Sequence, residues 1–181
     1  MKVVEAPSGW EYNNEVLLFL AGGIVDCPDW QSEVIEKLSE YDKKHPLNLI
    51  VFNPRRKNFP IHDKGAAKKQ IEWEFNCLEA SSIFSMWFCN AESDQPICMY
   101  ELGRHLNSMK IHVIGVEPGY RREQDVYIQT RLASLKNQIK ISKTLDEHVD
   151  KISNTEISEL SFQQLVKCIK MLMIERRALI L

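Results

Sequence analysis

Glu101 is the residue in this sequence whose type and position best fit a chemical role. It lies in the stretch 94–103, shortly after residues 82–89, an apolar run of strand length. A carboxylate on the helix that follows would stand near the carboxyl end of that strand, where open α/β sheets bind small molecules. The chemistry open to it is therefore that of a small-molecule site. The alternative is a solvated ion pair with Arg104, three residues further along the same helix.

Two further groups of residues follow other predicted strands. Arg55 and Arg56 lie in a proline-rich loop, residues 53–60, where an arginine could grip a phosphate through two hydrogen bonds, or where both could simply be solvated. Gly22 and Gly23 end the first apolar run and serve either a ligand or a tight turn. They do not match the dinucleotide-binding fingerprint, which needs a third glycine at the start of the helix.

The pair Trp73 and Glu74 lies near the centre of a predicted helix, residues 66–80. Packing in the core is the simpler role for the tryptophan, whereas the glutamate beside it is a second candidate carboxylate. His105 lies one helical turn beyond Glu101, but no other metal-type side chains cluster nearby, so the sequence implies no metal.

The composition is that of an ordinary globular domain. The 181 residues are 44% hydrophobic and 27% charged, with 23 basic and 25 acidic residues and a net charge of −2, so no basic excess points to nucleic acid. Five cysteines, an odd number without a Cys-x-x-Cys pair, fit reduced thiols. We expect a cytoplasmic protein, because we find neither a signal-peptide pattern nor an apolar run long enough to span a membrane.

Apolar runs alternate with helical patterns along the chain, which predicts a three-layer α/β domain with a mostly parallel sheet of about five strands. The strands are expected at residues 16–21, 48–52, 82–89, 111–116 and 138–141, and the helices at 29–45, 66–80 and 122–136, with a further helix that begins at Pro96 and carries Glu101. Residues 1–14 are expected to be an extended lead-in. We treat residues 1–181 as a single domain, with a core at about 16–142 and an amphipathic C-terminal helix at about 154–178.

Several short motifs, in this order and spacing, resemble one known family. They are Phe19-Leu20-Ala21-Gly22-Gly23-Ile24, Asp29-Trp30-Gln31, Asn53-Pro54-Arg55-Arg56, Gln70-Ile71-Glu72-Trp73-Glu74, Gln95-Pro96-Ile97 with Tyr100-Glu101-Leu102-Gly103, and Gly115-Val116-Glu117-Pro118-Gly119-Tyr120 with Asp125-Val126 and Gln129. The chain is similar to the nucleoside 2-deoxyribosyltransferase-like family over residues 17–129. The resemblance implies a flavodoxin-like fold in which the glutamate of the Glu-Leu-Gly motif, here Glu101, is the nucleophile.

The resemblance also implies roles for other residues. Acidic groups protonate the leaving base in relatives, and Glu74 and Asp94 are the candidates here by position. Expected substrate-binding residues are Gly22, Gly23, Asp29, Trp30, Arg55, Arg56, Trp73 and Tyr100. No cofactor is implied. The C-terminal tail has no counterpart in the family pattern, and its apolar helix could serve a homo-oligomer or complete a neighbouring subunit's site.

We therefore expect an enzyme that cleaves or transfers at the N-glycosidic bond of a nucleoside or nucleotide through a glycosyl intermediate on Glu101. The double arginine favours a phosphorylated substrate. Two alternatives stay open: an NAD glycohydrolase that uses the same glutamate, and a non-catalytic nucleotide-binding sensor. The sensor is favoured by Ser82, which stands where relatives often carry an aspartate. Neither nucleic acid nor a membrane is an expected partner.

Overall fold

The structure is a computed structural model that describes residues 1–60, 62–63, 65–133 and 139–155. Within these residues, five parallel strands form one sheet in the order β1-β3-β2-β4-β5. The strands are β1 (Lys2–Glu5), β2 (Val16–Gly22), β3 (Leu49–Asn53), β4 (Ile83–Phe88) and β5 (Ile111–Val116). The helices are α1 (Trp30–Lys44), α2 (Ala66–Ala80), α3 (Pro96–His105), α4 (Glu123–Ala133) and α5 (Leu145–Ser153).

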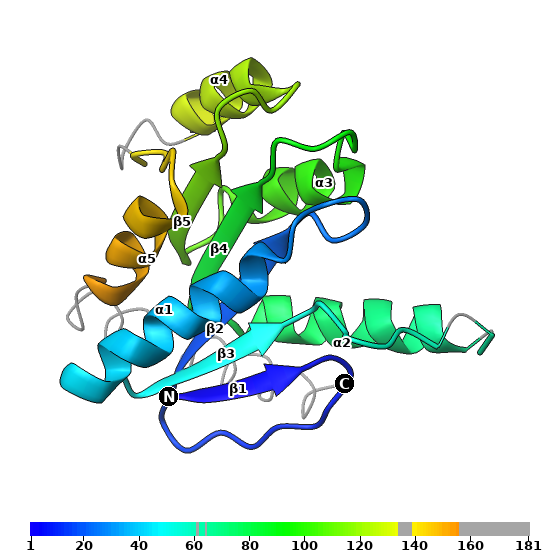
Figure 1. The fold of residues 1–181 in the computed structure, drawn as a ribbon, viewed down its shortest axis with the longest axis vertical. Coiled ribbons are helices and arrows are strands. Elements are labelled where there is room, and N and C mark those ends of the chain that lie inside the picture. Colours follow the sequence, from blue (N-terminus) through cyan, green and yellow to red (C-terminus); the bar gives the residue numbers. More distant parts are fainter. Residues whose placement is uncertain (61, 64, 134–138, 156–181) are drawn as a thin grey trace, which may run out of the picture.

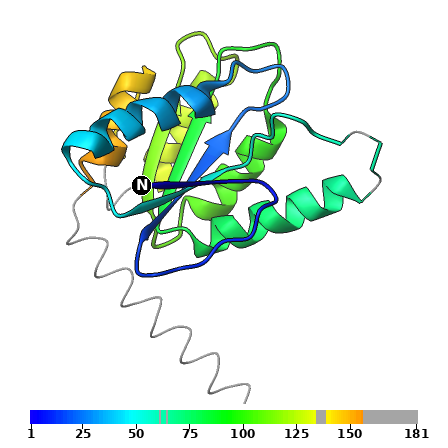
Figure 2. The ribbon, with the colours of Figure 1, turned by 60° about the horizontal axis from the view of Figure 1, so that its bottom comes forward.

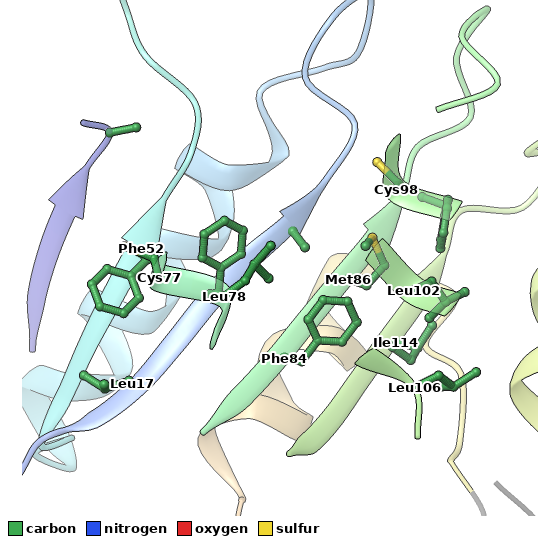
Figure 3. Packing of buried hydrophobic residues seen from close by; sticks show 14 of the residues in the cluster. Leu17, Phe52, Cys77, Leu78, Phe84, Met86, Cys98, Leu102, Leu106 and Ile114 are labelled. Atoms are coloured by element: carbon green, nitrogen blue, oxygen red, sulfur yellow. The ribbon is translucent and has the colours of Figure 1, made fainter. Parts of the chain in front are cut away.

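The domain has three layers, as the alternation of strands and helices predicts. Helices α1 and α5 pack on one face of the sheet, and α2, α3 and α4 pack on the other (Figures 1 and 2). Side chains of β2 alternate between the two cores: Leu18 faces α1, whereas Phe19 faces α2. On the α2 face, Phe84 and Met86 of β4 lie beside Leu102 of α3 (Figure 3).

Both faces of the central strands are covered, which explains their continuous apolar sequences. All residues of β3 and β4 are buried, and so are the five central residues of β2. This burial confirms the predicted α/β architecture. The observed bounds of α2 match the predicted ones, and α3 begins at Pro96 as predicted.

The position of β2 in the sheet creates a crevice. After β2 the chain crosses through α1 to β3 on one side, and after β3 it crosses through α2 to β4 on the other side of β2. The connections that leave β2 and β4 therefore run to opposite faces, toward α1 and α3. Ligands bind at such switch points, at the carboxyl ends of the strands.

The fifth strand differs from the prediction. It is β1, in the predicted lead-in, whereas residues 139–141 form no strand and Ser142 makes a single bridge to Gly115. β1 lies at the edge of the sheet, where two of its four residues are exposed, so its sequence lacks the continuous apolar run of a central strand. Trp10 packs its ring against Phe52, with the centroids 4.9 Å apart, and so attaches the lead-in to the core.

Helix α5 was not predicted from the sequence. Thr144 caps its first turn by accepting a hydrogen bond from the backbone N–H of Glu147, and its buried face carries His148 and Val149. The predicted C-terminal helix lies almost wholly outside the described residues. In the described part of the chain, no helix has the length and apolar character needed to cross a membrane.

Candidate active site

A pocket of about 240 Å³ opens at the carboxyl ends of β2 and β4. Phe19, Ala21 and Gly22 of β2 line it, and so do the next three residues, Gly23 to Val25. Glu74 of α2 and Glu101 of α3 also line it, together with the first turn of α3. The pocket thus occupies the crevice that the strand order creates.

Two glutamates from different helices therefore line the same pocket. Burial raises the pKa of Glu101 to about 7, with a further contribution from the negative charge of Glu74 and a smaller opposing one from Arg104. Burial also raises the pKa of Glu74. The negative charge of Glu74 therefore adds to burial in favouring the protonated form of Glu101.

Gln70 holds Glu74 in place. Its side-chain amide donates hydrogen bonds to Oε1 of Glu74, at 2.7 Å, and to the carbonyl of Pro54, at 2.8 Å. The bond to Glu74 opposes part of the effect of burial, because it stabilises the ionised carboxylate. Gln70 belongs to a motif that we noted in the sequence, but we did not predict this role.

Gly22 and Gly23 form one wall, and both positions require glycine. Gly22 has a φ of 153°, and a Cβ added there would lie 2.4 Å from the carbonyl oxygen of Trp87 and 2.5 Å from the ring of Trp30. A Cβ on Gly23 would lie 2.4 Å from the sulfur of Cys27. The backbone here approaches its neighbours more closely than any side chain would allow.

Gln95 lines the pocket beside Gly23 and was not predicted as a site residue. Its buried side chain accepts a hydrogen bond from the backbone N–H of Cys89 and donates one to the carbonyl of the same residue, at 3.2 and 2.8 Å. Its φ is 50°, a left-handed conformation just before the first residue of α3, Pro96. These bonds fix the start of the helix that carries Glu101. Sequence pattern gives no signal for such a role, since it depends on contacts between β4 and α3.

Arg55 does not project into the pocket but supports the loop of residues 22–28, here called the glycine loop. Its guanidinium donates hydrogen bonds to Gln31 and to three carbonyls, the shortest being Pro28 at 2.8 Å, and it forms an ion pair with Asp29 at 3.3 Å. Asp29 also caps α1 by accepting a hydrogen bond from the backbone N–H of Ser32. Nε and Nη2 of Arg55 are therefore already in use within the protein.

The two predicted tryptophans lie in the core rather than at the pocket surface. Trp30 is buried, and its Nε1 donates to the carbonyl of Gly23 at 3.0 Å. Trp73 donates to the carbonyl of Ser8 at 2.8 Å and packs against Phe52. Trp30 thus supports the glycine loop, and Trp73 attaches the lead-in to α2.

The remaining predicted residues lie outside the residues that line the pocket. Arg56 lies over the ring of Phe59, 5.3 Å from its centroid. Asp94 forms an ion pair with Arg121 at 3.3 Å. Tyr100 is 67% exposed on the outer side of α3.

Arg104, considered as an ion-pair partner for Glu101, pairs with a different carboxylate. Arg104 contacts Glu79 of α2 at 2.8 Å and lies over the ring of Phe75. Among the ion pairs of the described residues, Glu101 has no partner within contact distance, so its carboxyl group is available to a ligand.

The charges in the pocket limit what it can bind. The described side chains that line it include the two glutamates but no lysine or arginine. Groups of three or more metal-binding side chains are also absent from the described part of the chain. Apolar walls with two carboxyl groups suit a neutral ligand that gains positive charge during reaction.

Comparison with known protein families gives a match that covers the pocket. The sequence model of the family described as nucleoside 2-deoxyribosyltransferase like matches residues 15–120, more than half of the chain. The matched range runs from the strand preceding the glycine loop to Tyr120, so it contains both pocket glutamates. No curated protein matches the chain significantly.

Proposed function

The chain belongs to the nucleoside 2-deoxyribosyltransferase-like family, and from that premise we propose that it cleaves or transfers at the N-glycosidic bond of a nucleoside. One observation carries the proposal: Glu74 and Glu101 line a single apolar pocket at the carboxyl ends of the central strands. Glycosidic chemistry needs a pair of carboxyl groups of this kind, one ionised and one able to donate a proton.

In the proposed reaction, Glu101 is the nucleophile and Glu74 is the acid. The Glu101 carboxylate attacks the anomeric carbon as the C–N bond breaks, and the electron pair of that bond leaves with the base, which takes a proton from Glu74. Positive charge that develops on the sugar favours the ionised carboxylate beside it. Water or a second base then attacks the same carbon and gives its proton to Glu74, while the glycosyl–Glu101 bond breaks and Glu101 leaves as the carboxylate.

The ionisation of Glu101 gives the reaction a pH dependence. The raised pKa of Glu101, about 7, means that the nucleophile becomes fully ionised only above neutral pH. The raised pKa of Glu74 helps this group to keep a proton for the leaving base. Base release should therefore increase as pH rises through about 7, because Glu101 ionises over this range.

The pocket supports an unphosphorylated substrate, in contrast to the preference for a phosphorylated one that the double arginine suggested. A phosphate would meet two carboxyl groups and no cationic side chain among the lining residues, while Arg55 is occupied by the glycine loop. The volume of about 240 Å³ also lies below the ~300 Å³ at which sites for drug-sized ligands begin, which suits a nucleoside better than NAD.

The argument for a non-catalytic sensor depended on Ser82, and the place of Ser82 in the sheet weakens that argument. Ser82 immediately precedes β4 and bonds the backbone of Leu17 and Ile111, at the amino ends of the strands. The pocket lies at the opposite, carboxyl ends. The loss of an aspartate at this position therefore leaves the two pocket glutamates untouched.

The test is an assay of base release by wild type and Glu101→Ala, with nucleosides, nucleoside 5′-phosphates and NAD as substrates. We expect release from nucleosides with wild type and a loss of at least roughly 10³-fold in Glu101→Ala. Glu79→Gln, a change on the outer side of α2, is the control and should retain activity. Mass spectrometry should find an added glycosyl group on the peptide that contains Glu101. Equal activity in wild type and Glu101→Ala would contradict the mechanism, and binding without release would favour the sensor.

A further inference from the structure

We propose that the backbone N–H of Ile24 binds a hydroxyl group of the substrate's sugar, and that Trp30, Gln31 and Arg55 are positioning residues that aim this N–H into the pocket. The inference rests on the proposed nucleoside chemistry and adds to it a donor that none of the predicted side chains supplies. It begins with the carbonyl of Gly23, which belongs to the same peptide unit as the N–H of Ile24.

Three side-chain donors converge on the carbonyl oxygen of Gly23. Trp30 donates through Nε1 at 3.0 Å, Arg55 through Nη2 at 3.4 Å and Gln31 through Nε2 at 3.5 Å. Trp30 and Gln31 are 2% and 0% exposed, so two of these donors are held in the interior. A carbonyl accepts two hydrogen bonds through its lone pairs, so this oxygen is fully satisfied and its direction is fixed.

The direction of this carbonyl determines the direction of the next N–H. In a trans peptide unit the C=O and the following N–H lie in one plane and point in opposite directions. Trp30 and Gln31 belong to α1, which covers one face of the sheet, whereas Glu74 and Glu101 belong to the helices on the other face (Figures 1 and 2). Because the carbonyl points toward α1, the N–H of Ile24 points toward the side of the pocket glutamates.

The N–H of Ile24 is also available. Ile24 lines the pocket, and within the described residues no hydrogen-bond acceptor is found for its N–H. An unpaired backbone donor facing a pocket is costly unless water or a ligand satisfies it. The carbonyl of Ile24 is in use, since it accepts a hydrogen bond from the N–H of Cys27.

A sugar hydroxyl matches this arrangement better than other parts of a nucleoside. A hydroxyl accepts through its lone pairs and donates through its proton, so it can accept from Ile24 while donating to a carboxylate on the other side of the pocket. A base carbonyl can only accept. A single neutral N–H also gives little attraction for a phosphate, consistent with an unphosphorylated substrate.

The test compares Ile24→Pro, which removes the N–H, with Ile24→Ala, which shortens the side chain and keeps it. We expect the KM for a nucleoside to be roughly 3- to 10-fold higher in the proline variant than in the alanine variant, with kcat little changed, as for the loss of one neutral hydrogen bond. The difference between the variants should disappear for the one nucleoside analogue, in a set of 2′-, 3′- and 5′-deoxy compounds, that lacks the bound hydroxyl.

A second variant tests the positioning residues without changing the loop itself. Trp30→Phe removes the Nε1 donor to Gly23 and should raise KM more than it alters kcat. Trp10→Phe is the matched control, because Trp10 packs on Phe52 rather than on the glycine loop. Equal KM values for the proline and alanine variants with every analogue would overturn the inference and leave the proposed function standing. Failure of wild type to bind or cleave any nucleoside would overturn both.

Discussion

Replacing Glu101 with glutamine should stabilise the protein at alkaline pH while it abolishes base release. Burial and the charge of Glu74 raise the pKa of this group from 4.5 to about 7, so the folded protein keeps a proton that the unfolded chain loses near pH 4.5. Between these values the folded state binds more protons than the unfolded state. The free energy of unfolding of wild type therefore falls as pH rises through this window. In Glu101→Gln this decrease is absent, because glutamine does not ionise.

The size of the effect follows from the pKa. A change from 4.5 to about 7 corresponds to about 3 kcal/mol for a fully desolvated group. Glu101 is only partly buried, and solvent screening in the open pocket leaves roughly 1–2 kcal/mol. For a chain of this size, such a change raises the melting temperature by roughly 2–8 °C.

The measurement is thermal or urea unfolding of wild type and Glu101→Gln at about pH 5 and about pH 8.5. The variant should be clearly more stable at the higher pH and close to wild type at the lower one. Glu36→Gln, an exposed change on α1 at the other face of the sheet, should give the same small effect at both pH values. An identical difference at both pH values, or a variant less stable than wild type at pH 8.5, would refute the reasoning.

Three other predictions follow from the same contacts. Glu74→Gln removes the charge that helps to raise the pKa of Glu101, so the acid limb of the pH–rate profile should move to lower pH. The profile should be measured with a substrate whose base leaves without protonation. Gly22→Ala places a Cβ 2.4 Å from the carbonyl oxygen of Trp87 and should lower the free energy of unfolding by about 2 kcal/mol or more, measured with urea. Burial lowers the pKa of His148 from 6.5 to about 3, so the folded state keeps this side chain neutral over a pH range in which the unfolded chain takes up a proton. The free energy of unfolding should therefore fall as pH decreases below about 6.5. His148→Gln should therefore flatten the decline in melting temperature below about pH 6.

The order of the main elements could be predicted because burial leaves a local trace in the sequence. A parallel strand covered on both faces is a continuous apolar run, and β2, β3 and β4 each carry one. An edge strand such as β1 is half-exposed and carries no such run. Helix α5 is short and mostly polar, so its capping threonine is visible only once the helix is known.

The sequence by itself determined that Glu101 follows a buried strand on a helix beginning near Pro96, because the strand pattern and the proline are local signals. It could not decide between the neighbours Trp73 and Glu74, since consecutive helical residues point about 100° apart and only the packing of α2 sets which one faces the pocket.

Tertiary structure alone decided the role of Arg55 as well. Nε and Nη2 of its guanidinium bond carbonyls and a side chain up to 32 positions away in the chain, contacts that no local pattern records. The sequence thus determined which groups lie at the carboxyl ends of the strands. The fold decided that two carboxyl groups from different helices share one small pocket, where burial raises the pKa of both and the charge of Glu74 raises that of Glu101 further.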